Sequence, residues 1–196
     1  PSTKLTTNRL NKDNLYFSIL QTSSSKVLDA NGEPMVVYHG SRSSGFDVFE
    51  EHYGIYFTDS IDVAKVYSNG FGVSLWSGMQ EGMYHVYLNM RNPVVVDAKG
   101  KGWDSLGFEL NGEVLNSAEE IVKHIRENNL PDDGVIVRNV AYGDSGRQTG
   151  TNYVVLSPNQ IKDAYANNGT FPPEEESIPY SQKESDVTSA NKEVEK

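Results

Sequence analysis

The sequence predicts one α+β domain that is built mostly from short β-strands. The chain has 196 residues, which suits a single domain, and only 37% of them are hydrophobic, so part of the chain is expected outside the packed core. Runs rich in Val, Ile, Tyr and Phe recur between turn signals, whereas two central segments have helical spacing. Because strands and helices do not alternate regularly, a parallel βαβ sheet is not predicted.

The chain is expected to divide into three parts. Residues 1–25 form an N-terminal extension with one short helix, predicted from the apolar residues between Leu10 and Leu20. Residues 26–171 form the folded body. Residues 172–196 carry seven acidic residues, three lysines and five scattered apolar residues, too few to offset the entropy of ordering. This last part is therefore predicted to be a disordered acidic linker or tail.

Within the body, runs of β-branched and aromatic residues predict six strands. They lie at residues 35–38, 54–57, 84–90, 93–97, 134–140 and 152–156. Residues 60–67 and 117–127 have helical spacing; Ser60 is the expected N-cap of the first, and Ser117 with Glu120 forms a capping box in the second. Residues 97–116 are interpreted as a long loop or a hairpin insertion.

Composition and charge exclude several classes of function. The absence of cysteine excludes disulfides, Cys-ligated zinc and thiol catalysis. The net charge of −10 argues against bulk binding to nucleic acid or to an anionic membrane. No run of about 18 apolar residues is present, and the polar N-terminus lacks the apolar centre of a secretion signal. The chain does not begin with Met, which indicates a fragment or a processed product.

The first residues that point to chemistry are His39 and Gly40, at the expected end of the first strand. A glycine there lets a ligand approach the backbone closely, although a lone histidine at a strand end is more often structural. Tyr56, at the end of the next strand, and Tyr67, on the helix that follows, could enclose a flat cationic ring such as nicotinamide. Ordinary core tyrosines would have the same spacing, so both interpretations stay open.

Several separated motifs resemble a known family. The segments HGSR (39–42) and GIYFTDSIDVAKVY (54–67) are similar to the nicotinamide pocket of the diphtheria-toxin and poly(ADP-ribose) polymerase branch of ADP-ribosyltransferases. More closely, the chain resembles the ADP-ribosyltransferase domain of phage and mobile-element polyvalent proteins, through the ordered segments VLDANGEPMVVYHGS, YLNMRNPVVVD, DGVIVRNV, NYVVLSPNQIK and NNGTF. The resemblance covers residues 26–171 and implies a split antiparallel β-sheet core with few helices.

The resemblance also implies roles for individual residues. His39 would hydrogen-bond the adenosine-side ribose of NAD, and the backbone of Gly40 would hold the nicotinamide carboxamide. Tyr56 and Tyr67 would form the walls of the nicotinamide site, while Ala64 stands where the polymerases have a hydrogen-bonding serine. The remaining implied NAD contacts are Tyr38, Ser41, Arg42 and Gly54.

The third motif departs from the family pattern. The resemblance puts Asn152 where the polymerases have a glutamate, so the implied catalytic set is His39, Tyr56 and Asn152. Asparagine can hydrogen-bond a ribose hydroxyl but cannot take a proton. Either positioning and strain supply most of the acceleration, or another side chain takes the role. The alternatives are Gln148, Asp144, Asp163 and Glu50.

The resemblance implies a mono-ADP-ribosyltransferase that consumes NAD as a substrate and transfers ADP-ribose to a macromolecular acceptor, protein or nucleic acid. Because paired glutamates are missing at the third motif, arginine is disfavoured as the acceptor. The alternative is a catalytically inactive module that binds NAD, ADP-ribose or a partner. At the level of the family, we expect a toxin or effector that acts as a monomer in bacterial or host cytoplasm. An antitoxin is a possible partner, and no membrane partner is expected.

Other polar residues are interpreted as structural. Gln160 is expected to fix the exit of the last strand, and the acids Glu119 and Glu120 to favour the helix macrodipole. His52 and His124 are expected to face solvent. The histidines lack metal-like spacing, so no metal site is predicted.

Overall fold

The computed structural model of the chain describes residues 25–43, 45–69, 82–142, 148–166, 171 and 176–178. The helix expected between Leu10 and Leu20 lies outside the described residues. None of the helices in the described ranges is long and apolar enough to cross a bilayer.

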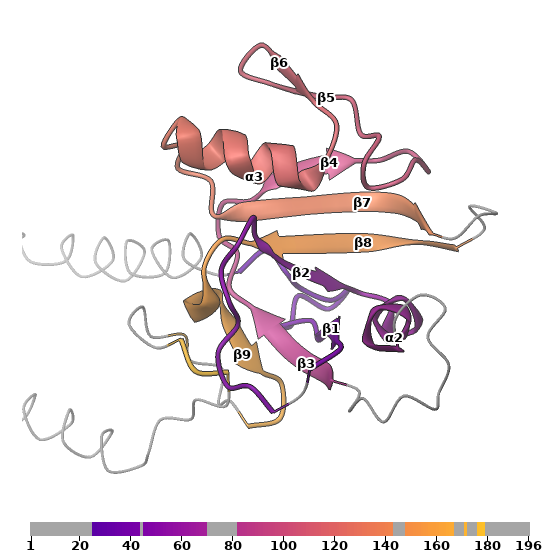
Figure 1. The fold of residues 1–196 in the computed structure, drawn as a ribbon, viewed down its shortest axis with the longest axis vertical. Helices are drawn as coiled ribbons and strands as arrows, with labels where there is room; N and C mark the ends of the chain where they lie inside the picture. The colour runs from indigo at the N-terminus through magenta and orange to yellow at the C-terminus, as the bar shows by residue number, and fades with distance from the viewer. Residues whose placement is uncertain are drawn as a thin grey trace, which may run out of the picture.

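The body is an α+β domain around one seven-stranded sheet (Figure 1). Its strands, in chain order, are β1 (Val37–Ser41), β2 (Ile55–Thr58), β3 (Gly82–Leu88), β4 (Val94–Asp97), β7 (Gly134–Tyr142), β8 (Gln148–Val155) and β9 (Ile161–Asp163). They lie in the order β4-β7-β8-β2-β1-β3-β9. All neighbours are antiparallel except β4 and β7, which are parallel. The predicted α+β class is confirmed, with this one parallel pair added to the expected antiparallel sheet.

The sheet is split between β1 and β2. β2 pairs with β8 along its whole length, and β1 pairs with β3 along its whole length. In contrast, β1 and β2 share a single register pair, Tyr38 with Thr58. Figure 1 shows β7 and β8 running across one half of the molecule and β3 and β9 crossing the other half at a steep angle. Beyond Tyr38, therefore, β1 does not pair with β2.

The predicted strands are present, although their limits differ. The first begins at Val37 rather than at residue 35 and continues through His39 and Gly40, so these two residues lie inside the strand and not after it. The insertion between β4 and the second helix is a hairpin of β5 (Phe108–Leu110) and β6 (Glu113–Leu115). β9 was not predicted, because three residues give no clear alternation.

Both central helices are confirmed, and their caps explain where they begin. In α2 (Ile61–Asn69), the Ser60 Oγ accepts a hydrogen bond from the Val63 N–H at 3.4 Å. In α3 (Ala118–Glu127), the Ser117 side chain accepts from the Glu120 N–H at 3.1 Å. Oxygen acceptors at these positions satisfy amide groups that have no partner within the helix.

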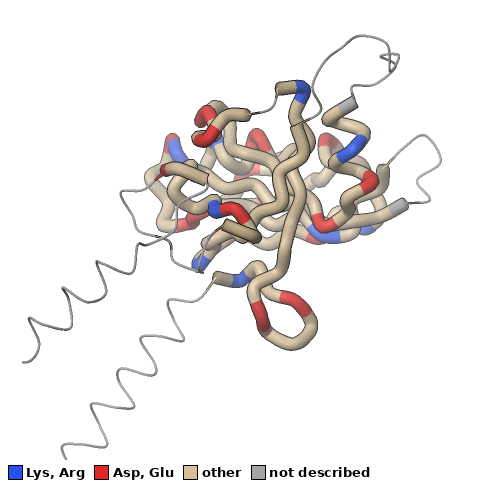
Figure 2. Tube along the Cα trace, turned by 90° about the horizontal axis from the view of Figure 1, so that it is seen from below, with Lys and Arg blue, Asp and Glu red and all other residues tan. Residues whose placement is uncertain are grey.

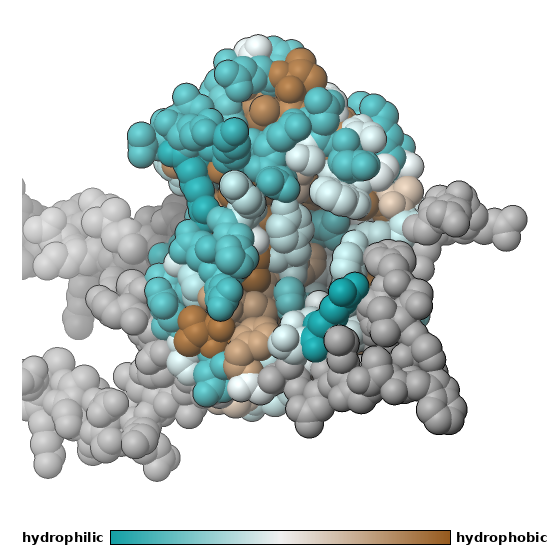
Figure 3. Space-filling model, in the orientation of Figure 1, coloured by the Kyte–Doolittle hydropathy of each residue, from teal (hydrophilic) through white to brown (hydrophobic). Residues whose placement is uncertain are grey.

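Each face of the sheet packs on its own hydrophobic core, because successive side chains of a β-strand point to opposite faces. On β7, Ile136 belongs to one core, with Phe57, Val86 and Ile161. Its neighbours Val135 and Val137 belong to the other, which packs against α3. Hydrophobic residues left at the surface lie in small separate groups on the face shown in Figure 3, one of them over the β5–β6 hairpin, where Val114 is 64% exposed.

His124 corrects an expectation. It was predicted to face solvent, but it is only 7% exposed, and its Nδ1 lies 3.0 Å from the Glu113 carboxylate of β6. The hairpin lies against this side of α3 and covers the residue, a long-range effect that helical spacing does not report. His52, in contrast, is exposed as expected.

The acidic tail also differs from its prediction at two described residues, Ser177 and Ile178. Ile178 is 3% exposed and belongs to one of the two cores. Its N–H donates to the Asp47 carbonyl at 2.7 Å, its carbonyl accepts from the Asp163 N–H at 2.8 Å, and the Lys162 Nζ donates to the Ser177 carbonyl at 2.9 Å. The packed body therefore extends beyond residue 171.

Gln160, in the short 3₁₀ turn η1 (Pro158–Gln160), fixes the exit of β8 as predicted. Its Oε1 accepts from the N–H groups of Leu156 and Ser157, both at 2.9 Å. Its Nε2 donates to the carbonyls of Asn89 and Asp133 at 3.1 and 2.8 Å. One side chain thus joins β8, β3 and the start of β7.

We expect Gln160→Ala to lower the free energy of unfolding by about 3 kcal/mol, because it leaves partly buried backbone groups without partners. Urea denaturation followed by circular dichroism measures this change. Asn31→Ala, at an exposed turn, is the control and should change stability by less than about 0.5 kcal/mol. Equal stability of the two variants would show that the four hydrogen bonds do not matter.

Candidate functional site

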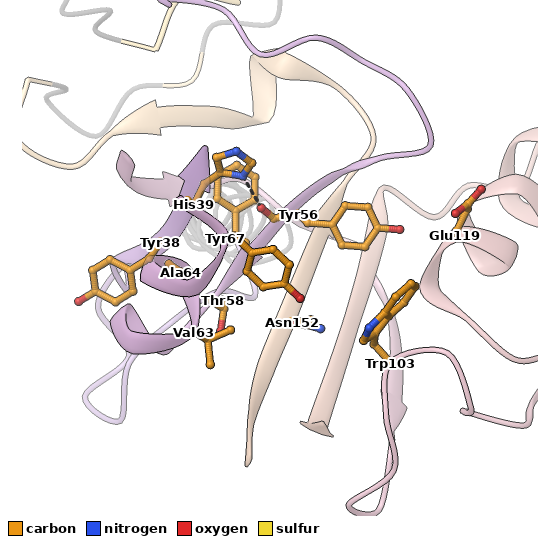
Figure 4. A pocket seen from close by; sticks show the side chains of 12 residues that line it. Tyr38, His39, Tyr56, Thr58, Val63, Ala64, Tyr67, Trp103, Glu119 and Asn152 are labelled. Atoms are coloured by element: carbon orange, nitrogen blue, oxygen red, sulfur yellow. Dashed lines mark hydrogen bonds between the residues drawn. The ribbon is translucent and has the colours of Figure 1, made fainter. Parts of the chain in front are cut away.

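A cavity of ≈ 310 Å³ opens at the split in the sheet. It is bounded by β1, β2, α2, β8, the loop after β4 and the first turn of α3. Its lining consists of Tyr38, His39, Gly40, Tyr56, Phe57, Thr58, Val63, Ala64, Tyr67, Trp103, Glu119 and Asn152. Figure 4 shows that these residues come from elements that are distant in the sequence, and that the Tyr38 ring points away from the other labelled side chains.

His39 connects the two strands across the split. Its Nδ1 lies 2.7 Å from the Tyr56 carbonyl, drawn as a dashed line in Figure 4. Since a carbonyl only accepts, Nδ1 carries the proton and Nε2 of the neutral ring is left as an acceptor. The rings of Phe49, Phe57 and Tyr84 surround the imidazole, with centroids 4.9 to 6.2 Å away. The hydrogen bond and the rings fix the orientation of this histidine.

Burial lowers the pKa of His39 below its ordinary value of 6.5, and the hydrogen bond to Tyr56 offsets this only in part. The folded state therefore binds this proton more weakly than the unfolded state does. As a result, the stability linked to His39 is complete above pH 6.5 and is lost as the pH falls from there through the lower folded-state pKa.

We therefore expect the free energy of unfolding to decrease between pH 7 and pH 5, and to decrease less in His39→Gln, which has no ionisable ring. Urea titrations at half-unit steps of pH measure both slopes. His52→Gln, at an exposed site, should keep the slope of the unmodified protein. Identical slopes for His39→Gln and the unmodified protein would refute the burial effect.

Gly40 allows β1 to lie directly against α2. A Cβ atom at this position would be 1.8 Å from the Ala64 carbonyl oxygen and 2.8 Å from the Ser68 nitrogen, both backbone atoms of the helix. No other residue type fits without moving α2. Because the single pairing of β1 with β2 is at Tyr38, Gly40 lies beyond it, at the open part of the split.

Tyr56 and Tyr67 bring two phenol rings to the same cavity from β2 and α2. Burial raises the pKa of Tyr56 to about 12, with a further contribution from the negative charge of Glu119. Burial also raises the pKa of Tyr67, which is 46% exposed. Both side chains are therefore neutral phenols at physiological pH. Figure 4 shows the Tyr67 hydroxyl pointing toward Asn152, and the Tyr56 hydroxyl pointing toward the gap between Trp103 and Glu119.

Asn152 lies on β8 opposite Thr58 of β2 and is hydrogen-bonded through its oxygen. The Tyr142 hydroxyl donates to its Oδ1, and burial raises the pKa of Tyr142 to about 12, so this donor stays protonated. With its oxygen engaged, Asn152 can offer the cavity its amide nitrogen, which is a donor. It can position a hydroxyl group or a carbonyl, but it supplies no base.

Six of the nine implied NAD-contacting or catalytic residues line the cavity, together with Ala64: Tyr38, His39, Gly40, Tyr56, Tyr67 and Asn152. Ser41, Arg42 and Gly54 are outside its lining. Gly54 packs instead against Val154, whose side chain would lie 2.4 Å from an added Cβ. Arg42 is exposed just after β1.

Of the acids considered as replacements for the missing glutamate, none of the described ones lies in the cavity. Asp163 is on β9, where its carboxylate accepts from the N–H groups of Tyr165 and Ala166. Glu50 is in an exposed loop beside His52. Asp144 and the side chain of Gln148 lie outside the described residues.

Sequence reasoning missed Trp103 and Glu119, which both line the cavity. Glu119 was interpreted only as an acid that favours the N-terminus of a helix, and Trp103 only as part of an insertion. No local pattern could have found them, because the path of the insertion after β4 decides where they lie. Among the described residues, no group of three or more His, Asp or Glu side chains is arranged to hold a metal ion.

A split sheet with a histidine, a glycine and two tyrosines at one cavity is the arrangement that the resemblance to ADP-ribosyltransferases implied. The sequence profile described as ADP-ribosyltransferase in polyvalent proteins matches residues 29–171. The chain therefore belongs to this family. Domains of this family type use NAD as the donor of ADP-ribose. A comparison with curated proteins finds no match.

Proposed function

We propose that this domain is a mono-ADP-ribosyltransferase that cleaves NAD and transfers ADP-ribose to a macromolecular acceptor. The observation that carries the proposal is the hydrogen bond of His39 to the Tyr56 carbonyl. This bond joins the two strands on either side of the split and orients one free imidazole nitrogen. The cavity beside it is lined by neutral aromatic rings, which suit a planar cationic ring.

The cavity residues fit the nicotinamide half of NAD. Tyr56 and Tyr67 would lie on its two faces, where stacking and cation–π attraction favour a positively charged pyridine ring. Gly40 lines the cavity, and its backbone groups would bind the carboxamide. Ala64 adds no hydrogen bond, so recognition of the amide would depend on the backbone.

The reaction breaks the bond between C1′ of the ribose and the nicotinamide nitrogen, and the electron pair leaves with neutral nicotinamide. As the positively charged pyridinium ring of NAD becomes neutral nicotinamide, positive charge develops on the ribose. The residues of this chain contribute by position: the neutral His39 Nε2 would accept from a ribose hydroxyl, and the amide nitrogen of Asn152 would donate to another oxygen.

Transfer of a single ADP-ribose unit is favoured over chain elongation. Elongation requires that a ribose hydroxyl of a bound unit be activated as the next nucleophile, for which a carboxylate near that hydroxyl is suited. Asn152 is neutral, and its oxygen is already hydrogen-bonded to Tyr142. We therefore propose mono-specific transfer, accompanied by slow hydrolysis of NAD.

The second candidate function is a binding module for NAD or ADP-ribose that has lost catalysis. The neutral, engaged Asn152 favours it. Isothermal titration calorimetry and chromatography of the same samples separate the two functions. An enzyme releases nicotinamide over hours, whereas a binding module holds NAD without a nicotinamide peak.

The biological role that we propose is an effector or toxin module carried by a polyvalent protein of a phage or another mobile element. The family description, which places such domains in polyvalent proteins, supports this role. An antitoxin would then be expected to cover the cavity in the producing cell. Co-expression of neighbouring reading frames, with growth as the measurement, would identify one.

The enzymatic proposal is tested by incubating the purified chain with NAD labelled in the adenylate part, together with a cell lysate. We expect release of nicotinamide and labelling of a macromolecule. Loss of the label on digestion with protease identifies a protein acceptor, and loss on digestion with nuclease identifies a nucleic acid. Tyr56→Ala should label nothing, while Tyr53→Ala, at an exposed loop position, should behave as the unmodified protein. No nicotinamide and no label from the unmodified chain would refute the proposal.

A further inference from the structure

The cavity has two chemically different ends. At one end lie His39, Gly40 and Ala64, where β1 packs on α2. At the other end lie Trp103 and Glu119, brought from the loop after β4 and from α3. Trp103 is 44% exposed and Glu119 is exposed, so this end opens to solvent. A second substrate can therefore reach the cavity at the end that the first does not fill.

The two neighbouring acids of α3 do different things. The Glu120 carboxylate accepts from the Asn116 N–H at 2.6 Å and so helps to begin the helix. Ala118, 2% exposed, packs into the core and fixes how the helix is turned. Glu119 faces the cavity, close enough that its charge raises the pKa of Tyr56. It is the one carboxylate among the described residues of the lining, which include no lysine or arginine.

Trp103 lines the same end of the cavity as Glu119, on a loop whose backbone is hydrogen-bonded to its surroundings. The Leu106 N–H donates to the Asn116 carbonyl at 2.8 Å, immediately before α3. The Lys101 carbonyl accepts from the Ala141 N–H of β7 at 2.9 Å. The loop is thus fastened on both sides of the tryptophan, and Figure 4 shows Trp103 and Glu119 on the side toward which the Tyr56 hydroxyl points.

We propose that Trp103 and Glu119 form an acceptor subsite for the guanidinium group of an arginine side chain on a protein. This inference rests on the proposed transferase function and names its substrate class. An aromatic face beside a single carboxylate suits a flat cation, which stacks on the indole and donates paired N–H groups to the carboxylate. A lysine ammonium lacks the planar shape, and an acidic acceptor would be repelled by Glu119.

The subsite changes the expectation drawn from the third motif. Arginine was disfavoured because no glutamates flank Asn152, but the structure brings a carboxylate to the cavity from α3. In the transfer step, a guanidinium nitrogen forms a bond to C1′ of the ribose while the C1′–nicotinamide bond breaks. The electron pair of the broken bond leaves with nicotinamide, and the attacking nitrogen gives one proton to Glu119. The product keeps a charged guanidinium, and the proton passes to solvent.

Charge argues against a nucleic-acid base as the acceptor, although guanine could also stack on an indole and donate to a carboxylate. The chain has a net charge of −10, which repels the phosphate backbone. Figure 2 shows Lys and Arg positions interspersed with Asp and Glu positions along the described part of the chain. A basic protein segment, in contrast, is attracted both by the net charge and by Glu119.

The test uses the full chain with NAD and agmatine, a small guanidine, and measures nicotinamide and ADP-ribosyl-agmatine by chromatography and mass spectrometry. We expect transfer to agmatine by the unmodified chain. Glu119→Gln should lower transfer to agmatine about 100-fold relative to release of nicotinamide to water, as the loss of a general base does. Trp103→Ala should raise the KM for agmatine about tenfold, as the loss of a cation–π contact predicts. Glu120→Gln, which keeps an acceptor for Asn116, is the matched control.

The outcomes separate this inference from the proposed function. If the unmodified chain hydrolyses NAD but labels a guanine-containing oligonucleotide and not agmatine, or if Glu119→Gln and Glu120→Gln transfer to agmatine equally well, the arginine subsite is refuted and the transferase stands. If the unmodified chain releases no nicotinamide at all, the proposed function falls and the subsite falls with it. Agmatine transfer that is lost only in Glu119→Gln and weakened in Trp103→Ala supports the subsite.

Discussion

His39→Ala should lower the rate of nicotinamide release at least about 100-fold, comparable to removing a positioned hydrogen-bonding group from an active site. The substitution removes the imidazole that would bind the donor ribose. It also removes the bond from Nδ1 to the Tyr56 carbonyl, so that the backbone next to one wall of the cavity loses its link to β1. Steady-state release of nicotinamide, followed by chromatography at saturating NAD, measures the change.

His52→Ala is the control for this substitution, since that side chain is exposed in the loop before β2. A matching fall in both variants would indicate a general effect of losing a histidine. Full activity of His39→Ala, with a correctly folded protein, would mean that the imidazole neither contacts NAD nor positions Tyr56.

Gly40→Ala should destabilise the domain by about 3 kcal/mol, the upper part of the range for inserting a methyl group into a packed region. The added Cβ would lie 1.8 Å from the Ala64 carbonyl oxygen, and backbone atoms cannot rotate away as a flexible side chain can. α2 must therefore shift, and it carries Ala64 and Tyr67 of the cavity lining. Thermal and urea denaturation measure the loss, and activity should fall in the protein that remains folded.

Gly102→Ala provides the matched control for Gly40→Ala. The nearest atom to its added Cβ is a carboxylate oxygen of Asp104, at 2.9 Å, which can rotate aside. Its stability should change by less than about 1 kcal/mol. If Gly40→Ala were as stable as Gly102→Ala, the close packing of β1 on α2 would be wrong.

Local signals in the sequence were sufficient where the structure is decided locally. The cap at Ser117 begins α3 as predicted, although the Glu120 carboxylate accepts from the Asn116 N–H and not from the Ser117 N–H of a full capping box. Valine-rich runs such as residues 134–140 became strands. The limits of β1 were less accurate, because its C-terminal half, with His39 and Gly40, lacks β-branched residues and is held by pairing with β3. The three-residue strand β9 exists only because it pairs with the end of β3.

The sequence predicted the part of the candidate site that residues 39–42 and 54–67 form. It did not predict the part that Trp103 and Glu119 form. His39, Gly40, Tyr56 and Tyr67 lie within a span of 29 residues, on the neighbouring strands β1 and β2 and on the helix α2 that follows. Glu119 reaches the same cavity through a hairpin insertion whose path no local pattern sets. The burial of His124 under that hairpin was missed for the same physical reason.

The most direct test of the nicotinamide cavity is a crystal structure of the chain with a non-hydrolysable NAD analogue. We expect the nicotinamide ring between Tyr56 and Tyr67, its carboxamide on the backbone of Gly40, and a ribose hydroxyl donating to Nε2 of His39. A nicotinamide ring bound anywhere else on the protein, with the cavity between these residues left vacant, would contradict the account.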